Sequence, residues 1–326
     1  MKYDKLINLK LTQLSGQTSQ PPWIINDKNQ FQGLLILNES PVLVKLSQNN
    51  INSLNIDYEL PINVDTYINE KKLKKEIFDE INRIYNLNFD LNKFYKFLSN
   101  DSQLADSINF CKGLRLFLAK NPFECIISSI CSANNSITRW TKSISQIESK
   151  WGEKFQFSSG NFYTFPNPNK LLNVPLDDLE EYESLNKSID IECCVNNLKA
   201  CGVGYRAPYM NKTSNIFSNQ INFNDMFGMK YEEAFETILK VPGVGPKVAD
   251  CILLYGFGFQ EAFPSDVWIK RIISTLYFDG EDISANKVRE FGINKFGDYA
   301  GYAQLYLFHY ARKSGLMNQI SSKKNK

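Results

Sequence analysis

Lys247 and Asp266 lie 19 positions apart in a segment whose pattern suggests two helices joined by a glycine-rich turn. Lys247 falls in the first turn of the second predicted helix, within an apolar run. A helix start and an apolar setting both disfavour a charged ammonium, and the neutral amine is the nucleophilic form. Asp266 follows Pro264 in FPSD and is predicted to cap a helix beginning at Val267. Each has an ordinary explanation alone, a solvated lysine or a plain cap, but their joint placement beside the turn favours an enzyme.

The turn that precedes Lys247 has the sequence PGVG. Apolar residues recur at helical spacing on both sides of it, and Pro246 suits the first position of the second helix. Glycines at a helix start leave backbone N–H groups open to an anion. A hairpin over about 231–255 would therefore grip a nucleic-acid backbone without reading its sequence. Gly243, Gly245 and Val248 are the predicted DNA contacts; the alternative is a turn that merely joins two helices.

Composition narrows the class of protein without deciding its function. The 326 residues contain 37 lysines and arginines against 35 aspartates and glutamates, so electrostatic steering of DNA toward the whole molecule should be modest. No apolar run approaches a membrane span, and the N-terminus lacks a signal-peptide core. We expect an intracellular protein, in the cytoplasm or nucleoid of a bacterium or the nucleus of a eukaryote. The seven scattered cysteines, Cys193 and Cys194 among them, are predicted to be reduced.

The elements that must position these residues follow from the hydrophobic pattern. Residues 1–60 alternate apolar runs such as FQGLLILN and PVLVKLS with turn residues, including Asn49-Asn50, which is typical of antiparallel strands. Helical periodicity dominates from about residue 70. We predict an α+β fold with a twisted antiparallel sheet and helices in residues 1–120, followed by a mostly α-helical region over 121–326. The terminal SSKKNK is expected to be disordered.

The segment VPGVGPKVADCILLYGFGFQEAFPSDV resembles the helix-hairpin-helix DNA glycosylase superfamily, specifically its 8-oxoguanine DNA glycosylase branch. The resemblance spans residues 8 to 310. Four further segments agree in the expected order: LSGQT (14–18), NPFECIISSICSANNSITR (121–139), GVGYRAPY (202–209) and GYAQLYLF (301–308).

The resemblance implies a bifunctional DNA repair enzyme. It would excise 8-oxoguanine, preferably opposite cytosine, from duplex DNA, after swinging the base out of the stack. Lys247 would attack the sugar and form a Schiff base, and the abasic strand would then break by β-elimination. Asp266 would stabilise the positive charge that develops on the sugar. The enzyme is expected to act as a monomer on double-stranded DNA that contains oxidised guanine.

The resemblance also assigns the lesion pocket. The carbonyl of Gly16 would accept the N7–H that 8-oxoguanine has and guanine lacks. Cys251 and Phe308 would sandwich the purine, and Gln304 would read its Watson–Crick edge. From the sequence alone, Cys251 and Phe308 would be core residues and Gln304 a surface amide.

On the opposite strand, the resemblance assigns Tyr205 as the wedge beside the vacated position. Asn134, Arg139 and Arg206 would hold the estranged cytosine, the arginines through its acceptor atoms. Simpler explanations exist for each: a core tyrosine, a helix break, and arginines that lie on the surface or contact phosphates.

Two positions depart from the family's pattern. Animal and fungal members usually have a phosphate-contacting histidine where this chain has Trp268, and often an aspartate that supports it where this chain has Ala311. Because both positions change together, we infer a repacked phosphate contact rather than a lost site.

No cofactor is expected for this chemistry. The chain has no cysteine after Cys251, so the iron–sulfur cluster of endonuclease III is excluded, and its single histidine, His309, argues against zinc. A structural cation held by the hairpin carbonyls of Val241 and Val244 is an additional expectation. Two alternatives stay open: a glycosylase of the same superfamily for another damaged base, and a non-catalytic DNA-binding module, which would not need a lysine–aspartate pair.

Overall fold

A computed structural model describes residues 1–62, 69–176 and 196–316 of the chain. Cys193 and Cys194, predicted to be reduced, and the terminal SSKKNK, predicted to be disordered, lie outside these residues. The five cysteines within them are free and buried, in agreement with the expected reduced thiols. None of the helices in the described ranges is both long and apolar enough to span a bilayer.

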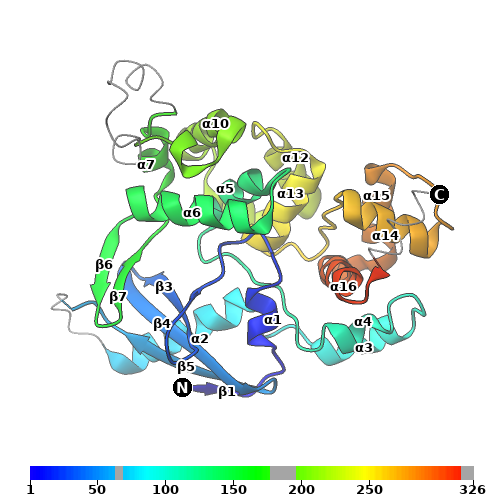
Figure 1. Ribbon diagram of the computed structural model, residues 1–326, viewed down its shortest axis with the longest axis horizontal. Helices are drawn as coiled ribbons and strands as arrows, with labels where there is room; N and C mark the ends of the chain where they lie inside the picture. Colours follow the sequence, from blue (N-terminus) through cyan, green and yellow to red (C-terminus); the bar gives the residue numbers. More distant parts are fainter. Residues whose placement is uncertain (63–68, 177–195, 317–326) are drawn as a thin grey trace.

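The N-terminal part forms the antiparallel sheet that the sequence predicts (Figure 1). Its strands lie in the order β1-β5-β4-β3-β2. β4 continues through Asn50 and pairs there with Ser53, so the turn comes slightly later than the predicted Asn49-Asn50. The strands are β1 (Lys2–Tyr3), β2 (Ile24–Ile25), β3 (Phe31–Leu37), β4 (Ser40–Asn50) and β5 (Ser53–Glu59).

The two faces of this sheet are covered by different partners. Val42, Val44 and Leu46 alternate along β4 and pack with the apolar side of helix α2 (Glu70–Ile84). Leu43 points the other way and packs with Phe157 and Phe162. These two phenylalanines belong to a hairpin of strands β6 (Lys154–Phe157) and β7 (Gly160–Tyr163), which lies in a region predicted to be mostly helical.

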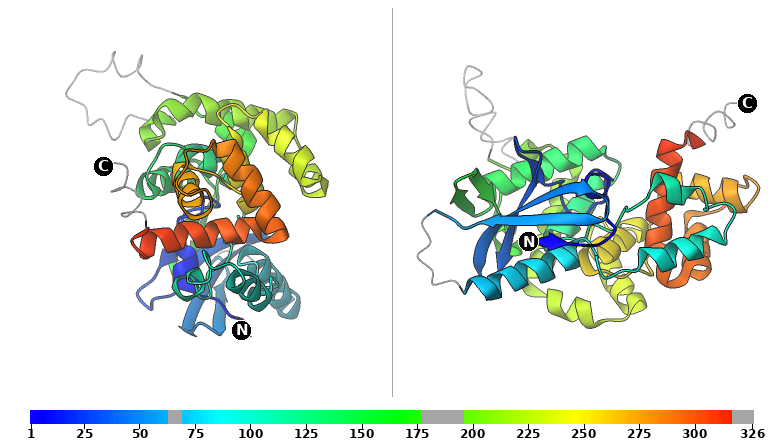
Figure 2. Two further views of the ribbon diagram at one scale, coloured as in Figure 1. Left: turned by 90° about the vertical axis from the view of Figure 1, so that its right-hand side faces the viewer. Right: turned by 90° about the horizontal axis from the view of Figure 1, so that it is seen from below.

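The remaining elements are helices, as predicted for the larger part of the chain (Figure 2). They are α1 (Leu9–Gln13), α3 (Leu91–Ser99), α4 (Ser107–Phe110), α5 (Pro122–Ser132), α6 (Ile137–Trp151), α7 (Pro168–Leu172), α10 (Ala207–Asn219), α11 (Phe223–Gly228), α12 (Tyr231–Leu239), α13 (Pro246–Ile252), α14 (Val267–Tyr277), α15 (Ala285–Phe296) and α16 (Ala300–Lys313), with a π-helical turn η3 (Leu253–Phe257) and 3₁₀ turns η1 (Lys199–Cys201), η2 (Gly204–Arg206) and η4 (Gly297–Tyr299).

Helix α5 lies at the centre of the helical part. Nine consecutive residues, Phe123 to Cys131, are buried, which is the pattern of a helix surrounded by other elements. It contacts α6, α10 and α13, so the helix that carries Lys247 packs directly against the core.

Helices α3 and α4 pack on α16, although more than 180 residues separate them in sequence. The ring of Phe94 meets Tyr306 edge-on with centroids 5.0 Å apart, and the hydroxyls of Tyr95 and Tyr306 are 3.1 Å apart. The chain before residue 120 therefore supports the helix that brings Gln304 and Phe308 to the site.

Candidate active site

One cleft brings together all six residues predicted for catalysis and lesion binding. It encloses about 450 Å³, its open mouth included. Four separate stretches of chain contribute to it: the loop after α1, helix α13, the segment before α14, and α16. Its lining residues are Ser15, Gly16, Gln17, Thr18, Lys247, Cys251, Tyr255, Pro264, Asp266, Gln304, Leu305 and Phe308.

Lys247 lies in the first turn of α13, as predicted. Pro246 occupies the helix start, and Gly245, with an extended backbone, stands at the N-cap. The lysine side chain is half-buried, and it forms no ion pair or hydrogen bond with the residues that the structure describes. Burial raises the pKa of the Cys251 thiol, and the positive charge of Lys247 partly opposes that rise. The amine therefore lies close to the pocket cysteine and is not engaged elsewhere.

Asp266 caps α14, as the sequence predicts. Its Oδ1 accepts hydrogen bonds from the backbone N–H of Trp268 at 3.0 Å and of Ile269 at 2.8 Å. No ion pair of 4 Å or less joins it to Lys247 within the described part of the chain, although both line the same cleft. The capping bonds fix the orientation of the carboxylate. They use only Oδ1, so Oδ2 takes no part in capping the helix.

The loop that carries Gly16 is anchored by the two side chains that follow it, Gln17 and Thr18. Gln17 donates from Nε2 to the Arg115 carbonyl at 3.0 Å and accepts at Oε1 from the Phe117 N–H at 2.8 Å. The hydroxyls of Thr18 and Ser129 are 3.0 Å apart, which ties the loop to α5. Gly16 has φ +86°, a conformation that favours glycine.

Helix α16 supplies the opposite wall of the cleft. Gln304 is only 7% exposed, so the surface amide expected from the sequence alone is wrong. Its Oε1 is buried without a hydrogen-bond partner among the described residues. This oxygen is therefore free to accept a hydrogen bond from a donor in the cleft. Phe308, one turn further along, is half-buried with its ring on the cleft.

The glycine hairpin has two unlike glycines. Gly243 has φ +81°, and a Cβ added there would lie 2.7 Å from Cγ of Tyr209. Gly245 has an extended backbone and open space where a Cβ would project. Val244 donates its N–H to the Val241 carbonyl at 3.1 Å, which closes the turn, and Val248 is buried behind it.

A buried polar network behind the hairpin was not foreseen from the sequence. The Tyr231 hydroxyl on α12 donates to Oδ1 of Asp250 on α13 at 2.5 Å. Arg289 on α15 donates from Nε to Oδ2 of Asp250 at 2.7 Å and from Nη2 to the Tyr231 hydroxyl at 2.5 Å. Three helices are thus joined at Asp250, one turn after Lys247. The three residues lie far apart in sequence, so the sequence gives no signal of this network.

A second group of predicted residues gathers around the α5–α6 turn and η2. Tyr205 is 59% exposed, and the Arg206 guanidinium lies over its ring at 4.4 Å from the centroid. Asn134 is exposed with φ +50°, and Arg139 is exposed in the first turn of α6. The structure thus brings the four opposite-strand candidates into one region.

Arg206 itself is buried and already hydrogen-bonded. Its Nε donates to the Ala133 carbonyl at 3.0 Å, its Nη1 to Val203 at 3.3 Å and its Nη2 to Asn134 at 3.2 Å. The predicted contact with cytosine needs free N–H donors, and most donors of Arg206 already bind backbone carbonyls. With these bonds in place, Arg206 holds the turn on which Asn134 lies.

Trp268 and Ala311 occupy the two atypical positions. Trp268 is half-buried in the first turn of α14, and the guanidinium of Arg271 lies 5.1 Å from its ring centroid. Ala311 is fully buried in α16. A cation over an indole therefore stands where the family's histidine would be.

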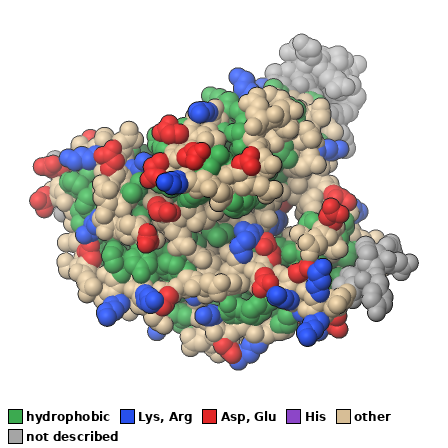
Figure 3. Space-filling view, turned by 180° about the vertical axis from the view of Figure 1, so that it is seen from behind, with side chains coloured by type: hydrophobic (Ala, Val, Ile, Leu, Met, Phe, Trp, Pro, Cys, Tyr) green, Lys and Arg blue, Asp and Glu red, His purple; other side chains and the backbone are tan. Residues whose placement is uncertain are grey.

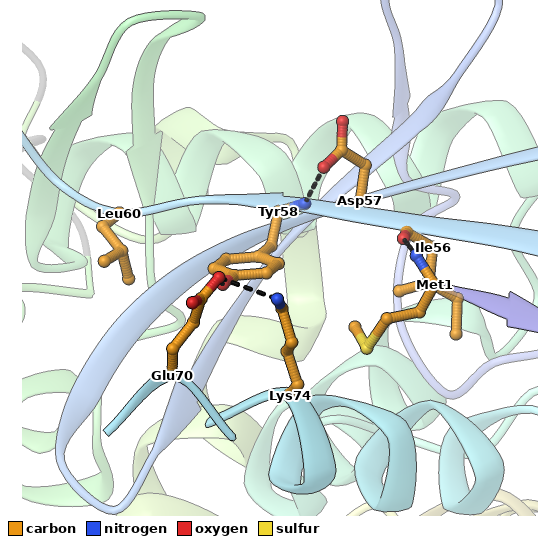
Figure 4. A pocket seen from close by; sticks show the side chains of 7 residues that line it. All are labelled: Met1, Ile56, Asp57, Tyr58, Leu60, Glu70 and Lys74. Carbon is orange, nitrogen blue, oxygen red and sulfur yellow. Dashed lines mark hydrogen bonds and ion pairs between the residues drawn. The ribbon is translucent and has the colours of Figure 1, made fainter. Parts of the chain in front are cut away.

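A larger cavity elsewhere carries no comparable chemistry. It lies between β5 and α2, and its polar groups bind one another (Figure 4). The terminal ammonium of Met1 donates to the Ile56 carbonyl at 2.6 Å, and Lys74 pairs with Glu70 at 2.7 Å.

On the face seen in Figure 3, acidic and basic side chains are interspersed, in keeping with the small net charge. In the described ranges, no three histidine, cysteine or acidic side chains are grouped as metal ligands.

Two family profiles together match nearly the whole chain. Residues 2–126 match the 8-oxoguanine DNA glycosylase N-terminal domain, and residues 127–295 match the HhH-GPD superfamily of base excision DNA repair proteins. Among curated proteins, a probable N-glycosylase/DNA lyase of Methanothermobacter thermautotrophicus is 42% identical over 96% of both chains. An N-glycosylase/DNA lyase of Arabidopsis thaliana is 27% identical over 65% of this chain and 56% of its own.

Solved structures of the same kind are also similar. An 8-oxoguanine glycosylase/lyase of Clostridium acetobutylicum, bound to double-stranded DNA with cytosine opposite 8-oxoguanine, superimposes with a TM-score of 0.75. It is 30% identical, and the match covers 95% of this chain and 93% of that one. A structure described as MBOgg1 in complex with a low-affinity DNA ligand gives a TM-score of 0.76 at 28% identity, covering 96% and 95%.

Proposed function

The chain belongs to the 8-oxoguanine DNA glycosylase branch of the helix-hairpin-helix N-glycosylase/DNA lyases, and we propose that it excises 8-oxoguanine opposite cytosine from duplex DNA. The proposal includes a Schiff base on Lys247 and cleavage of the abasic strand by β-elimination. One observation carries it: Lys247, Asp266 and the four residues assigned to the lesion converge on a single cleft from four stretches of sequence.

The first step uses the amine that is not engaged elsewhere. Lys247 attacks C1′ of the flipped nucleotide, the C1′–N9 bond breaks, and the base leaves with the bonding electrons and is protonated. The sugar passes through an oxocarbenium-like state, whose positive charge lies near the Asp266 carboxylate. Because α14 fixes this carboxylate, little reorganisation is needed as the charge develops.

The second step follows from the bond that Lys247 has made. Opening of the sugar ring gives an iminium between its Nζ and C1′, and this acidifies the C2′ protons. Loss of one of these protons expels the 3′ phosphate, which breaks the strand. Hydrolysis of the imine then returns the lysine to its starting state, so no external cofactor is required.

The DNA itself would be held at two places. Backbone N–H groups of the hairpin at Gly245 and Val248 would bind a phosphate, helped by the N-terminus of α13. Tyr205 would fill the vacated position, and Asn134 and Arg139 would contact the estranged cytosine. A cation at the carbonyls of Val241 and Val244 would be structural and would take no part in the reaction.

Borohydride trapping tests the proposal directly. Wild-type protein incubated with an 8-oxoguanine·cytosine duplex and borohydride should become covalently linked to the DNA, because the reductant converts the imine to a stable amine. Lys247→Gln should give no adduct. Lys154→Gln, which alters an exposed lysine on β6, is the matched control and should trap like wild type. An adduct of undiminished yield with Lys247→Gln would remove Lys247 from this role.

A panel of duplexes then decides the substrate. Cleavage of 8-oxoguanine opposite each of the four bases should be fastest opposite cytosine. Preference for an alkylated purine or an oxidised pyrimidine would assign another member of the superfamily, and binding without any cleavage would leave only a DNA-binding protein.

A further inference from the structure

Arg312 lies at the mouth of the lesion cleft, a position to which neither the chemistry nor the sequence patterns drew attention. It follows Phe308 by four residues on α16, so both side chains project from one side of the helix. Its guanidinium carbon is 5.4 Å from the Phe308 ring centroid. Its Nη1 is 3.9 Å from the point where a Cβ on Gly16 would stand. The guanidinium therefore bridges the two walls that would hold the purine.

The charge of Arg312 is not neutralised within the described part of the chain. The side chain is exposed, and it forms no ion pair and no hydrogen bond with the described residues. A guanidinium stays protonated at every relevant pH and offers five N–H donors. A charged donor thus stands at the rim of the cleft without a hydrogen-bond or ion-pair partner among the described residues.

We propose that Arg312 donates a hydrogen bond to O8 of the lesion and is a specificity-determining residue of the excision step. This rests on the proposed function, in which the Gly16 carbonyl accepts the N7–H and Phe308 covers one face of the base. O8 is bonded to the carbon next to N7, so the edge that meets Gly16 also presents O8 toward Nη1 of Arg312.

The contact would read the atom that defines the damage. Guanine has a hydrogen at C8 and offers no acceptor there, so a guanidinium at this point would lose its partner with the undamaged base. The base also departs with the C1′–N9 bonding electrons, and a positive charge beside its five-membered ring lowers the energy of that developing anion. The same arginine would therefore favour both recognition and bond breakage of 8-oxoguanine.

Abasic DNA separates this role from simple binding of the phosphate backbone. An abasic site has the same phosphates and sugar but no O8. A residue that reads O8 should leave Schiff base formation and strand cleavage at an abasic site unchanged, whereas a residue that grips the backbone should affect both substrates alike.

The experiment compares Arg312→Met with Lys313→Met, which removes the neighbouring exposed cation of the same helix turn. Excision of 8-oxoguanine opposite cytosine is measured under single-turnover conditions, and cleavage and borohydride trapping are measured on a preformed abasic duplex. We expect Arg312→Met to slow excision by about 10-fold, the size of one charged base contact. Its abasic-site cleavage should stay within about twofold of wild type, and Lys313→Met should resemble wild type on both.

Two results would overturn the role of Arg312. One is unchanged excision by Arg312→Met; the other is an equal loss on the lesion and the abasic duplex. A different result bears on the proposed function itself: wild-type protein that cleaves abasic DNA yet leaves 8-oxoguanine in place would show that the cleft takes another base.

Discussion

The hairpin glycine Gly243 lies directly against the ring of Tyr209, which in turn meets Tyr205 edge-on with centroids 6.5 Å apart. The proposed phosphate-binding turn and the proposed wedge are therefore connected through one tyrosine. Gly245, two residues further on, has no such neighbour. The two glycines should consequently respond in opposite ways to the same substitution.

Gly243→Ala should destabilise the folded protein. The left-handed backbone and the nearby Tyr209 ring together are expected to cost about 1–3 kcal/mol of the free energy of unfolding. Gly245→Ala should leave stability close to wild type because its Cβ projects into open space. It should instead weaken binding of duplex DNA by about 10-fold, since that space is where a phosphate would approach. Urea unfolding and a fluorescence anisotropy titration measure the two effects, and similar stability losses for both variants would contradict this assignment.

Asp266→Asn should separate the cap from the charge. The amide oxygen of asparagine can still accept from the N–H groups of Trp268 and Ile269, so stability should change little. Excision should fall by about 100-fold because the carboxylate charge is lost. Asp266→Ala removes both functions and should also lower the free energy of unfolding by about 1 kcal/mol. Single-turnover excision and thermal unfolding of the two variants provide the comparison; full activity in Asp266→Asn would show that its charge is unimportant.

Arg139 and Arg206 should have different roles despite their shared assignment. Arg139→Ala is expected to reduce the preference for cytosine opposite the lesion by about 10-fold while the fold is unaffected. Arg206→Ala removes the side-chain donor of the Ala133 and Asn134 carbonyls and should lower the free energy of unfolding by about 1–3 kcal/mol. Excision rates opposite all four bases, measured beside melting curves, test both. Unchanged base preference in Arg139→Ala would refute its assignment.

His309 should make stability depend on pH. Burial, together with the charges of Lys313 and Arg312, lowers the pKa of His309 to about 4. The unfolded chain, with an ordinary histidine pKa of about 6.5, binds the proton more tightly. His309 therefore costs the folded state no stability above pH 6.5 and destabilises it as the pH falls from there toward 4.

Removing the imidazole should cancel that part of the pH dependence. At pH 5 the expected loss attributable to His309 is about 1 kcal/mol after allowance for solvent screening. His309→Gln should show a smaller difference between pH 7.5 and pH 5 in its free energy of unfolding, measured with urea. Because the chain has one histidine, the difference between variant and wild type isolates this group from the carboxylates. If the free energies of unfolding of wild type and His309→Gln change with pH in parallel, His309 does not cause the pH dependence.

The hairpin was accessible to prediction because its signals are local. Pro246 at the helix start and Asp266 at the N-cap of α14 follow from neighbouring residues alone. The central strands of the N-terminal sheet are apolar runs bounded by turn residues, a pattern that is visible in the sequence itself. The sheet and the helical remainder could therefore be predicted from local sequence patterns, to within a residue or two at the turn near Asn50.

The lesion pocket could not be derived in this way. α16 is buried over almost its whole length, so periodicity gives no reason to select Gln304 or Phe308 from its neighbours; the family resemblance selected them. The Tyr231–Asp250–Arg289 network depends on packing between helices far apart in sequence. The β6–β7 hairpin was missed because its strands have only four residues each.

The lesion cleft joins the loop at Gly16 to Phe308, near the two ends of the described chain. A ribosome synthesises the first wall long before the last, so a nascent chain that stops after α13 and before α16 contains the helical hairpin but lacks the wall that carries Gln304 and Phe308. Truncated translation products of this kind should therefore lack a complete cleft for a base.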